Sequence, residues 1–273
     1  KELINQGYTP FLASDGNALN LLKKEFPNLI ALELPSYEIE YAKKAKNFKW
    51  KLLKNSPKTI NAIIEEKKLV KKWCEEYDLA GIISDNRLGD DNKKVPSVII
   101  THQLRVLSGK TTWISSKLHQ RFIKKFNECW VPDFEKKPNL TGKLGHLKDA
   151  SFTVKYLGPL SRLNILKTEK KYDLMIILSG PEPQRTLLEE LLIKKIHFLD
   201  KKVLFVKGLV SDKQVVSENE HITFYNFMTS VEIEKAFNES EIILCRSGYT
   251  TIMDLVKLNK KAFLIPTPGQ TEQ

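Results

Sequence analysis

The chain has few cysteines, and their spacing excludes two kinds of small protein. Its 273 residues include only three, Cys74, Cys129 and Cys245, which lie far apart and form no C-x-x-C pair. A disulfide framework needs an even set of cysteines, and a zinc site needs clustered ligands. We therefore expect buried free thiols in a reducing cytoplasm and no bound metal.

Long apolar runs are also absent. No run reaches the ~18–20 residues that a membrane-spanning helix needs, and no signal peptide is visible. With 41% apolar and 28% charged residues, the composition is that of a packed soluble protein large enough for two domains. The chain opens like a helix end and closes like a loop before a helix, so we expect both ends to be incomplete.

Negative charge is scarce in the first part of the chain. Residues 1–160 hold 28 Lys and Arg against 18 Asp and Glu, a net +10, whereas residues 161–273 hold 16 against 15, a net +1. This asymmetry indicates an anionic partner such as acidic lipid, a phosphorylated substrate or nucleic acid. It also fits a lysine-rich proteome with no such partner. No known nucleic-acid-binding module appears, so we expect no nucleic acid partner.

Apolar strand patterns alternate with amphipathic helix patterns in two series, which is typical of parallel sheets covered on both faces. The longest predicted helix spans 57–77, with Pro57 in its first turn. A polar stretch at 163–171 resembles a linker between the series. We expect an α/β fold with two Rossmann-like domains, residues 1–160 and 161–273, facing each other across a cleft.

Polar residues at strand ends are the candidate site residues, because ligands of such sheets bind beyond the carboxyl ends of the strands. The segment "CRSGYTTIMDL" places Arg246, Ser247 and Gly248 between a strand and a helix. A glycine turn and a helix N-terminus suit a diphosphate, and Asp254, further along the helix, suits a ribose diol. The alternative is an ordinary helix start with a solvent-facing Asp254.

Five segments together resemble the donor half of family 28 glycosyltransferases: "YLGPLSR", "LSGPEPQR", "FYNFM", "CRSGYTTIMDL" and "PTPGQTEQ". The best-known member of that family adds N-acetylglucosamine to lipid I to form lipid II. The resemblance implies the GT-B fold and these donor contacts: Arg162, Ser179 and Gly180 on the phosphates, Phe227 and Met228 on uracil, Arg246, Ser247 and Gly248 near the nucleotide, Asp254 on ribose, and Gln270 and Gln273 on the sugar.

The first half resembles the family more loosely, through "VIITHQ" and "SDNRLG". The resemblance implies inverting transfer of a sugar, N-acetylglucosamine, from a UDP-sugar to a lipid-linked or anionic acceptor without a metal. A base must deprotonate the acceptor hydroxyl, and the candidates are His102 and Asp85. The family's first strand and Gly-rich loop should precede Lys1, and that loop is another source of the base. Asp254 stands where the family usually has Glu.

A lysine-rich segment with interspersed aromatics suggests a membrane contact. Its residues are Lys43, Lys44, Lys46, Lys49, Trp50 and Lys51. Such a segment suits an anionic membrane surface, which predicts a cytoplasmic protein that is peripheral on the inner face of the membrane. A solvated helix start is an equal alternative. Two other functions stay open: a UDP-sugar epimerase of similar fold, and a non-catalytic protein that binds a nucleotide-sugar or anionic lipid.

Overall fold

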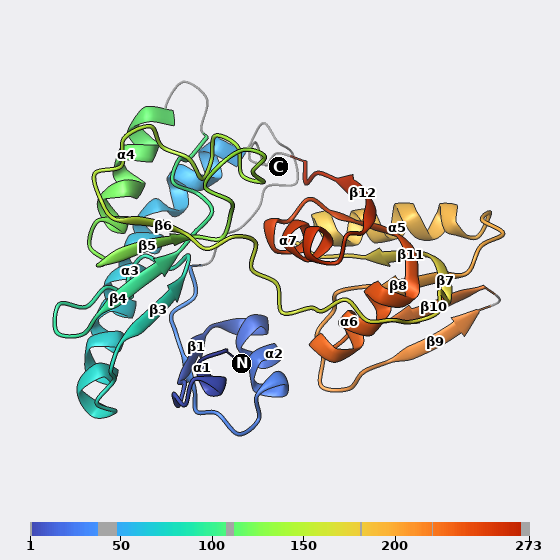
Figure 1. Cartoon of the computed structure of the whole chain (residues 1–273), viewed down its shortest axis with the longest axis horizontal. Coiled ribbons are helices and arrows are strands. Elements are labelled where there is room, and N and C mark those ends of the chain that lie inside the picture. The colour runs from blue at the N-terminus through green and yellow to red at the C-terminus, as the bar shows by residue number, and fades with distance from the viewer. Residues whose placement is uncertain (1, 38–47, 108–111, 181, 220, 269–273) are drawn as a thin grey trace.

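Strands and helices alternate along much of the chain in a computed structural model, with three runs of consecutive strands: β3–β4, β5–β7 and β8–β10 (Figure 1). The structure describes residues 2–37, 48–107, 112–180, 182–219 and 221–268, and within 48–59 the backbone alone. None of the described helices combines the length and the apolar character that crossing a membrane requires.

The N-terminal half, from α1 to β6, contains two parallel sheets rather than one. β1 pairs only with β2, while the other four strands follow the order β3-β4-β5-β6. One edge of β1 and one edge of β3 thus have no strand partner among the described residues. The elements of this half are α1 (Glu2–Asn5), β1 (Leu12–Ser14), α2 (Gly16–Glu25), β2 (Ala31–Glu33), α3 (Phe48–Glu76), β3 (Ile82–Asp85), β4 (Ser97–Ile100), α4 (Thr112–Ile123), β5 (Glu128–Val131) and β6 (Val154–Tyr156).

The predicted start of the long helix was wrong. α3 begins at Phe48, nine residues before Pro57. The preceding sequence, "FKWKLLKNS", is rich in Lys and Leu, which favour helix, and it carries the helix across the proline. The Lys-rich segment proposed for membrane contact lies mostly outside the described residues. Lys43, Lys44 and Lys46 precede α3, and Lys49, Trp50 and Lys51 belong to its backbone-only first turns.

The C-terminal half, from β7 to β12, is one six-stranded sheet of order β12-β11-β7-β8-β10-β9. All neighbouring strands are parallel except β9, which runs antiparallel to β10. The elements of this half are β7 (Tyr172–Ile177), α5 (Gln184–Ile196), β8 (Val203–Val206), β9 (Val216–Asn219), β10 (Ile222–Tyr225), α6 (Ser230–Glu239), β11 (Ser240–Arg246), α7 (Tyr249–Lys257) and β12 (Lys261–Ile265).

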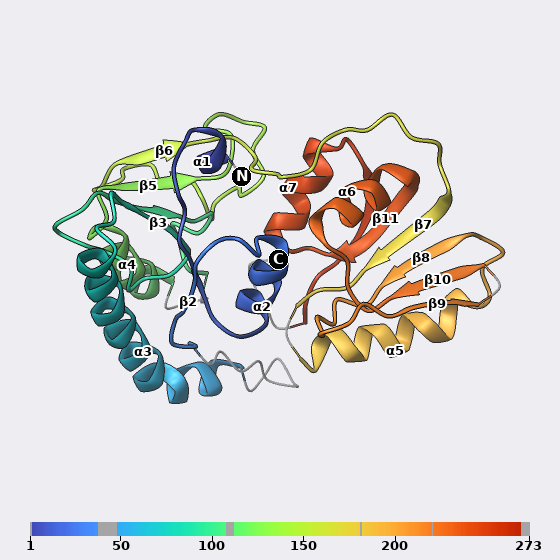
Figure 2. The same cartoon turned by 90° about the horizontal axis from the view of Figure 1, so that it is seen from below.

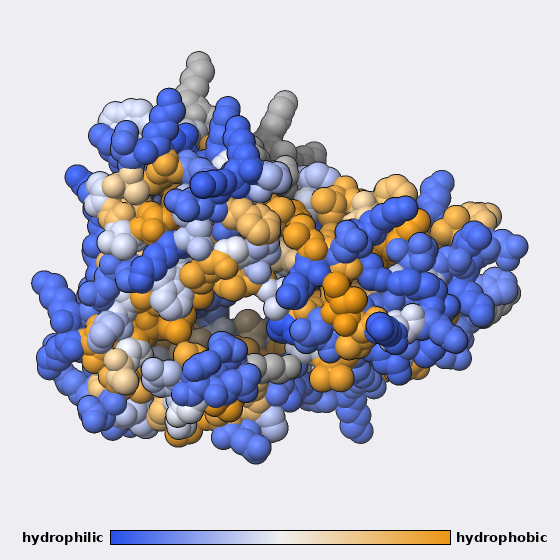
Figure 3. Space-filling view, viewed as in Figure 1, coloured by the Kyte–Doolittle hydropathy of each residue, from blue (hydrophilic) through white to orange (hydrophobic). Residues whose placement is uncertain are grey.

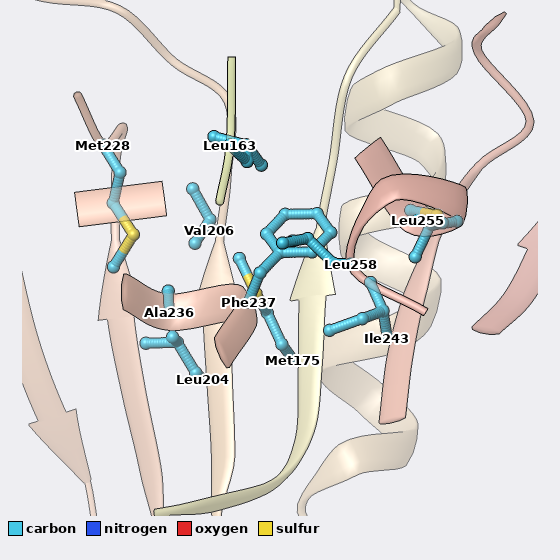
Figure 4. Packing of buried hydrophobic residues seen from close by; sticks show 11 residues of the cluster. Leu163, Met175, Leu204, Val206, Met228, Ala236, Phe237, Ile243, Leu255 and Leu258 are labelled. Carbon is cyan, nitrogen blue, oxygen red and sulfur yellow. The ribbon is translucent and has the colours of Figure 1, made fainter. Parts of the chain in front are cut away.

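Helices cover both faces of this sheet, with α5 on one side and α6 and α7 on the other (Figure 2). Successive strand residues point to opposite faces. Met175 and Leu204 accordingly belong to the cluster under α6 and α7 (Figure 4), whereas their neighbours Ile176 and Phe205 pack against α5. This two-sided burial explains the continuous apolar strands seen in the sequence. Cys74, Cys129 and Cys245 are free and buried, as predicted.

The segment between the halves packs along the C-terminal half. Leu163 is buried in the cluster under α6 and α7. The amide of Asn164 donates to Glu234 Oε1 at 2.6 Å, and that of Leu166 donates to Asn238 Oδ1 at 2.9 Å, both on α6. The stretch predicted as a linker is therefore held against α6 by specific contacts.

Candidate functional site

Two predicted turns meet at the carboxyl edge of the C-terminal sheet. The chain leaves β7 toward β8 on one side, and β11 later pairs on the other side, so the strand order reverses between β7 and β11. Ile177 and Cys245 are register partners, which brings Ser179 and Gly180 close to the turn that begins at Arg246. Ligands of open α/β sheets bind in the crevice at such a reversal.

The two helices that start at this crevice differ in how their N-termini are filled. At α5, the Glu182 carboxylate accepts hydrogen bonds from the amide of Thr186 at 3.3 Å and from its hydroxyl at 2.8 Å. The pKa of Glu182 is lowered, because the hydrogen bonds from Thr186 and Arg185 outweigh the opposing effect of desolvation. At α7 the N-cap residue is Gly248, which has no side chain to cap the helix. An external anion is therefore better accommodated at α7 than at α5.

Gly180 and Gly208 allow the loops after β7 and β8 to lie close together. Gly180 has a φ of +103° and open space where a Cβ would stand. Gly208 has a φ of +73°, and a Cβ there would lie 2.2 Å from the carbonyl oxygen of Leu178. Both positions therefore favour glycine. Ser179 and Gly180 are exposed at the crevice.

Arg246, predicted to approach the nucleotide, is buried and bonded to protein. Its Nη1 donates to the carbonyl of Pro266 at 3.0 Å, and its Nη2 donates to the carbonyl of Gln184 at 2.7 Å. Burial lowers the pKa of the guanidinium. The side chain thus joins the ends of β11 and β12 to the start of α5, and it shapes the crevice without pointing a free charge into it.

Asp254 and Arg162, far apart in sequence, lie near each other beside α7. Asp254 Oδ1 accepts a hydrogen bond of 2.6 Å from the hydroxyl of Ser161. Desolvation raises the pKa of Asp254, and Ser161 and the positive charge of Arg162 act against this rise. Ser161 uses only one of the two carboxylate oxygens. Arg162 is exposed and lies close enough for its charge to act on Asp254.

The predicted uracil contacts lie in a closed part of the structure. Phe227 and Met228 are buried, and Met228 belongs to the cluster under α6 and α7. The carbonyl of Phe227 accepts from Gln214 Nε2 at 2.9 Å, and its amide donates to Asn226 Oδ1 at 3.0 Å. The backbone groups of Phe227 are therefore already engaged within the protein. Gln270 and Gln273 lie outside the described residues.

The two candidate bases lie at the carboxyl edge of the N-terminal sheet and have opposite pKa shifts. Asp85 ends β3 opposite Ile100 of β4, and His102 follows two residues later. Desolvation raises the pKa of Asp85 although its side chain reaches solvent. Desolvation lowers the pKa of His102 to about 4, so its imidazole is neutral at pH 7. A base works best with a pKa near the operating pH, so the rise strengthens Asp85 as a base relative to an ordinary carboxylate and the fall weakens His102 relative to an ordinary histidine.

The two halves meet at two places that sequence reasoning missed. The Tyr249 ring stacks on His102 with the ring centroids 4.3 Å apart, and its hydroxyl donates to the carbonyl of Pro132 at 2.8 Å. Elsewhere α2 reaches the C-terminal half, where Lys24 Nζ donates to the carbonyl of Asp212 at 2.9 Å. In the sequence, the one feature that could have pointed to this contact is the position of Tyr249 directly after the Arg-Ser-Gly turn. Figure 3 shows an opening between the halves.

A buried ionic network at the carboxyl edge of the N-terminal half was also missed. Arg87 donates to both carboxylate oxygens of the fully buried Glu66, at 3.0 and 3.1 Å. It also donates to Asp15 Oδ1 at 2.9 Å and to the carbonyl of Pro35 at 2.6 Å. Asp15 follows β1 and Pro35 follows β2, so Arg87 links both sheets of this half. No group of three or more His, Cys, Asp or Glu side chains is placed to bind a metal in the parts of the chain that the structure describes.

Comparison with known proteins finds a family that the C-terminal part of the chain resembles. The model of the glycosyltransferase family 28 C-terminal domain matches residues 186–273. A sequence search of curated proteins finds no match. The matched region contains α7, Asp254 and the Arg246 turn, which are the parts of the crevice described above.

Solved structures resemble the chain over nearly its whole length. The spinosyn rhamnosyltransferase SpnG complexed with thymidine diphosphate is 10% identical, with a TM-score of 0.58 over 99% of this chain and 76% of that one. SsfS6, a glycosyltransferase of Streptomyces sp. SF2575, is 10% identical, with a TM-score of 0.56 over 98% and 76%. MurG of Acinetobacter baumannii is 13% identical, with a TM-score of 0.49 over 99% and 74%. Residues 186–273 thus match the C-terminal domain of family 28 glycosyltransferases, and the fold of the chain is GT-B.

Proposed function

We propose that the chain transfers N-acetylglucosamine, with inversion, from a UDP-sugar to a membrane-associated or anionic acceptor. The observation that carries the proposal is the convergence at one crevice of an uncapped helix N-terminus, an exposed arginine and a half-engaged carboxylate. These are α7, Arg162 and Asp254. Their chemistry matches the diphosphate and the ribose of a nucleoside diphosphate sugar.

The leaving group of such a reaction is a nucleoside diphosphate, on which negative charge develops as the glycosidic bond breaks. Arg162 and the N–H groups at the start of α7 are fixed positive groups that stabilise this charge without a metal. Asp85 accepts the proton of the acceptor hydroxyl, because it ends β3 at the carboxyl edge, its side chain reaches solvent and desolvation raises its pKa. The neutral His102 ring lies beside the same edge.

The ribose contact gives the sharpest test of the donor. If Asp254 accepts a hydrogen bond from the ribose 2′-hydroxyl, UDP binds more tightly than 2′-deoxy-UDP. A hydrogen bond to a charged group contributes about 1.5–3 kcal/mol, so we expect a preference of about tenfold or more. Titration calorimetry should show this preference in the wild type and its loss in Asp254→Ala. Arg162→Ala should weaken both ligands equally, since it acts on the phosphates.

Asp200→Ala is the matched control, because it removes an exposed carboxylate next to β8 at the opposite edge of the same sheet. Unchanged UDP affinity in both Asp254→Ala and Arg162→Ala would reject the donor site.

Incubation with UDP-N-acetylglucosamine separates the alternative functions. Release of UDP only in the presence of a prenyl-diphosphate-linked acceptor supports transfer. A new sugar formed from the donor alone supports an epimerase, and binding without turnover supports a non-catalytic protein.

The outer face of α4 supports a membrane-associated acceptor. Trp113, Ile114 and Leu118 are 64, 59 and 55% exposed on this helix. Residues 92–127, which include α4, hold eight Lys and Arg and no Asp or Glu. Lys117 lies over the Trp113 ring at 4.8 Å. Exposed apolar side chains among cations are the features of a helix that lies on an anionic membrane surface.

We therefore predict that the protein binds vesicles containing anionic phospholipid and that added salt weakens this binding. Trp113→Ala combined with Leu118→Ser should reduce vesicle binding at least severalfold, because both side chains lose their insertion into lipid. Phe198→Ala is the control, since it removes an even more exposed apolar side chain from the C-terminal half. Vesicle co-sedimentation measures the effect. Equal binding to neutral and anionic vesicles, or an equal loss in the control, would contradict the prediction.

A further inference from the structure

We propose that Tyr249 is a positioning residue that fixes the His102 ring and couples the donor-binding turn of the C-terminal half to the catalytic edge of the N-terminal half. The coupling to the donor rests on the proposed function, whereas the fixing of His102 does not. Three observations carry the proposal: the place of Tyr249 in the chain, its two contacts across the halves, and the way in which His102 is held.

Tyr249 is the first residue of α7 and directly follows Gly248. Its own amide thus belongs to the helix N-terminus at the crevice, while its side chain leaves the C-terminal half. The ring lies nearly parallel to the His102 imidazole, at an interplanar angle of 11°. The hydroxyl reaches the Pro132 carbonyl, next to the end of β5. One side chain therefore contacts the ends of two neighbouring strands of the opposite half.

The main chain of His102 is held by its own half. The amide of Gln103 donates to Thr101 Oγ1 at 3.1 Å, and the carbonyl of Gln103 contacts His119 Nε2 at 2.9 Å. A Cβ on Gly145 would lie 3.1 Å from the His102 carbonyl, so that loop packs directly on it. The backbone is thus fixed from one side. The imidazole ring, by contrast, stacks on the Tyr249 ring of the C-terminal half.

Burial of this ring has a measurable consequence. Removal from water lowers the pKa of His102 from its ordinary 6.5 to about 4, and the stacked Tyr249 ring is part of what excludes the water. The other contact between the halves is of a different kind, since it involves the exposed ends of Lys24 and the Glu25 carboxylate on α2. Any ligand that moves the start of α7 must also move the cover of His102, and this coupling is reciprocal.

The test follows His102 by NMR in protein labelled at its five histidines, with His102→Gln to assign the signal. We expect His102 to titrate near pH 4 in the wild type. Tyr249→Phe keeps the ring and loses only the hydroxyl, so its titration should stay close to that value. Tyr249→Ala uncovers the imidazole, and its pKa should rise toward 6.5. His146 and His221 serve as internal controls for the fold. If His102 had the same pKa in Tyr249→Ala as in the wild type, the proposal would be overturned.

A second arm adds saturating UDP. In the wild type the His102 signals should shift, and in Tyr249→Ala they should stay in place while calorimetry confirms that UDP still binds. Bound UDP with no change at His102 in the wild type would overturn the coupling. Absence of any UDP binding to the wild type would instead overturn the proposed donor site, and the pH titration alone would then decide the contact between Tyr249 and His102.

Discussion

Asp133 is a buried carboxylate that organises the turn after β5. Its Oδ1 accepts from the amides of Phe134 at 2.7 Å and Leu140 at 2.9 Å, and its Oδ2 accepts from the amide of Thr141 at 2.8 Å. The hydrogen bonds outweigh desolvation and lower its pKa. Asp133 follows the end of β5, a kind of position at which the sequence pattern predicts a ligand contact. Its hydrogen bonds instead fold back onto the chain and order a stretch rich in Lys, Gly and Pro.

We predict that Asp133→Asn lowers the free energy of unfolding by about 1–3 kcal/mol at pH 7, because an amide nitrogen then faces backbone donors. A lowered folded pKa contributes stability above the ordinary pKa of about 3.9, and this contribution is lost as the pH falls through the folded value. The difference between wild type and variant should therefore shrink from pH 6 to pH 3. Urea unfolding at both pH values measures it. Asp149→Asn, an exposed change nearby, should have no effect at either pH, and a pH-independent loss in Asp133→Asn would contradict the prediction.

At the scale of elements, the small sheet β1–β2 depends on an ion pair rather than on strand pairing to the larger sheet. An isolated pair of strands is marginal in water. Arg87 joins the residues after β1 and β2 to α3 through the fork that its guanidinium makes with Glu66. Its face also covers the Tyr37 ring at 4.5 Å. The Arg87 side chain thus connects the small sheet to the rest of the N-terminal half by hydrogen bonds.

We predict that Arg87→Met costs about 3–5 kcal/mol of unfolding free energy, since the buried Glu66 carboxylate loses the guanidinium that balances its charge. Arg87→Lys should recover only part of this loss, because an ammonium cannot reproduce the two parallel bonds. Arg87→Met combined with Glu66→Gln should be more stable than Arg87→Met alone, which separates the buried charge from lost packing. Chemical denaturation measures all three. Equal stability of Arg87→Lys and wild type would show that the fork geometry is unimportant.

The elements themselves were largely predictable, and their connections were not. Strands such as β8 have four buried residues in a row, and a continuous apolar run records that burial directly. β9 was missed because all four of its residues are exposed and leave no apolar pattern. The contact between Ser161 and Asp254 joins residues 93 positions apart. Likewise, a sequence pattern does not record that Glu182 accepts hydrogen bonds from Thr186 at the N-terminus of α5. Nor does it record that the Arg246 guanidinium donates to buried backbone carbonyls.

At the scale of the whole molecule, the polar and aromatic contacts between the described parts of the two halves gather at two places. α2 lies on the side of the N-terminal half that faces the C-terminal half in both Figure 1 and Figure 2. There Glu25 Oε2 accepts from the amide of Ser230, at the start of α6, at 3.2 Å, and Lys24 lies 5.5 Å from the centre of the Phe227 ring. Tyr249 forms the other contact. Motion of the halves is then governed by a few side chains.

We predict that Lys24→Ala combined with Glu25→Ala widens the separation of the halves without unfolding either. Exposed charged contacts contribute about 0.2–1 kcal/mol each, which is enough to shift an opening equilibrium and too little to shift the melting temperature strongly. Spin labels on cysteines introduced at Lys93 and Val231 report the distance distribution, and the native cysteines are buried. Raised salt should broaden the wild-type distribution in the same way, because screening weakens the same contacts. Lys23→Ala, an exposed change on the same helix, should leave the distribution as in the wild type, and an unchanged distribution in the double variant would show that the Tyr249 contact alone holds the halves together.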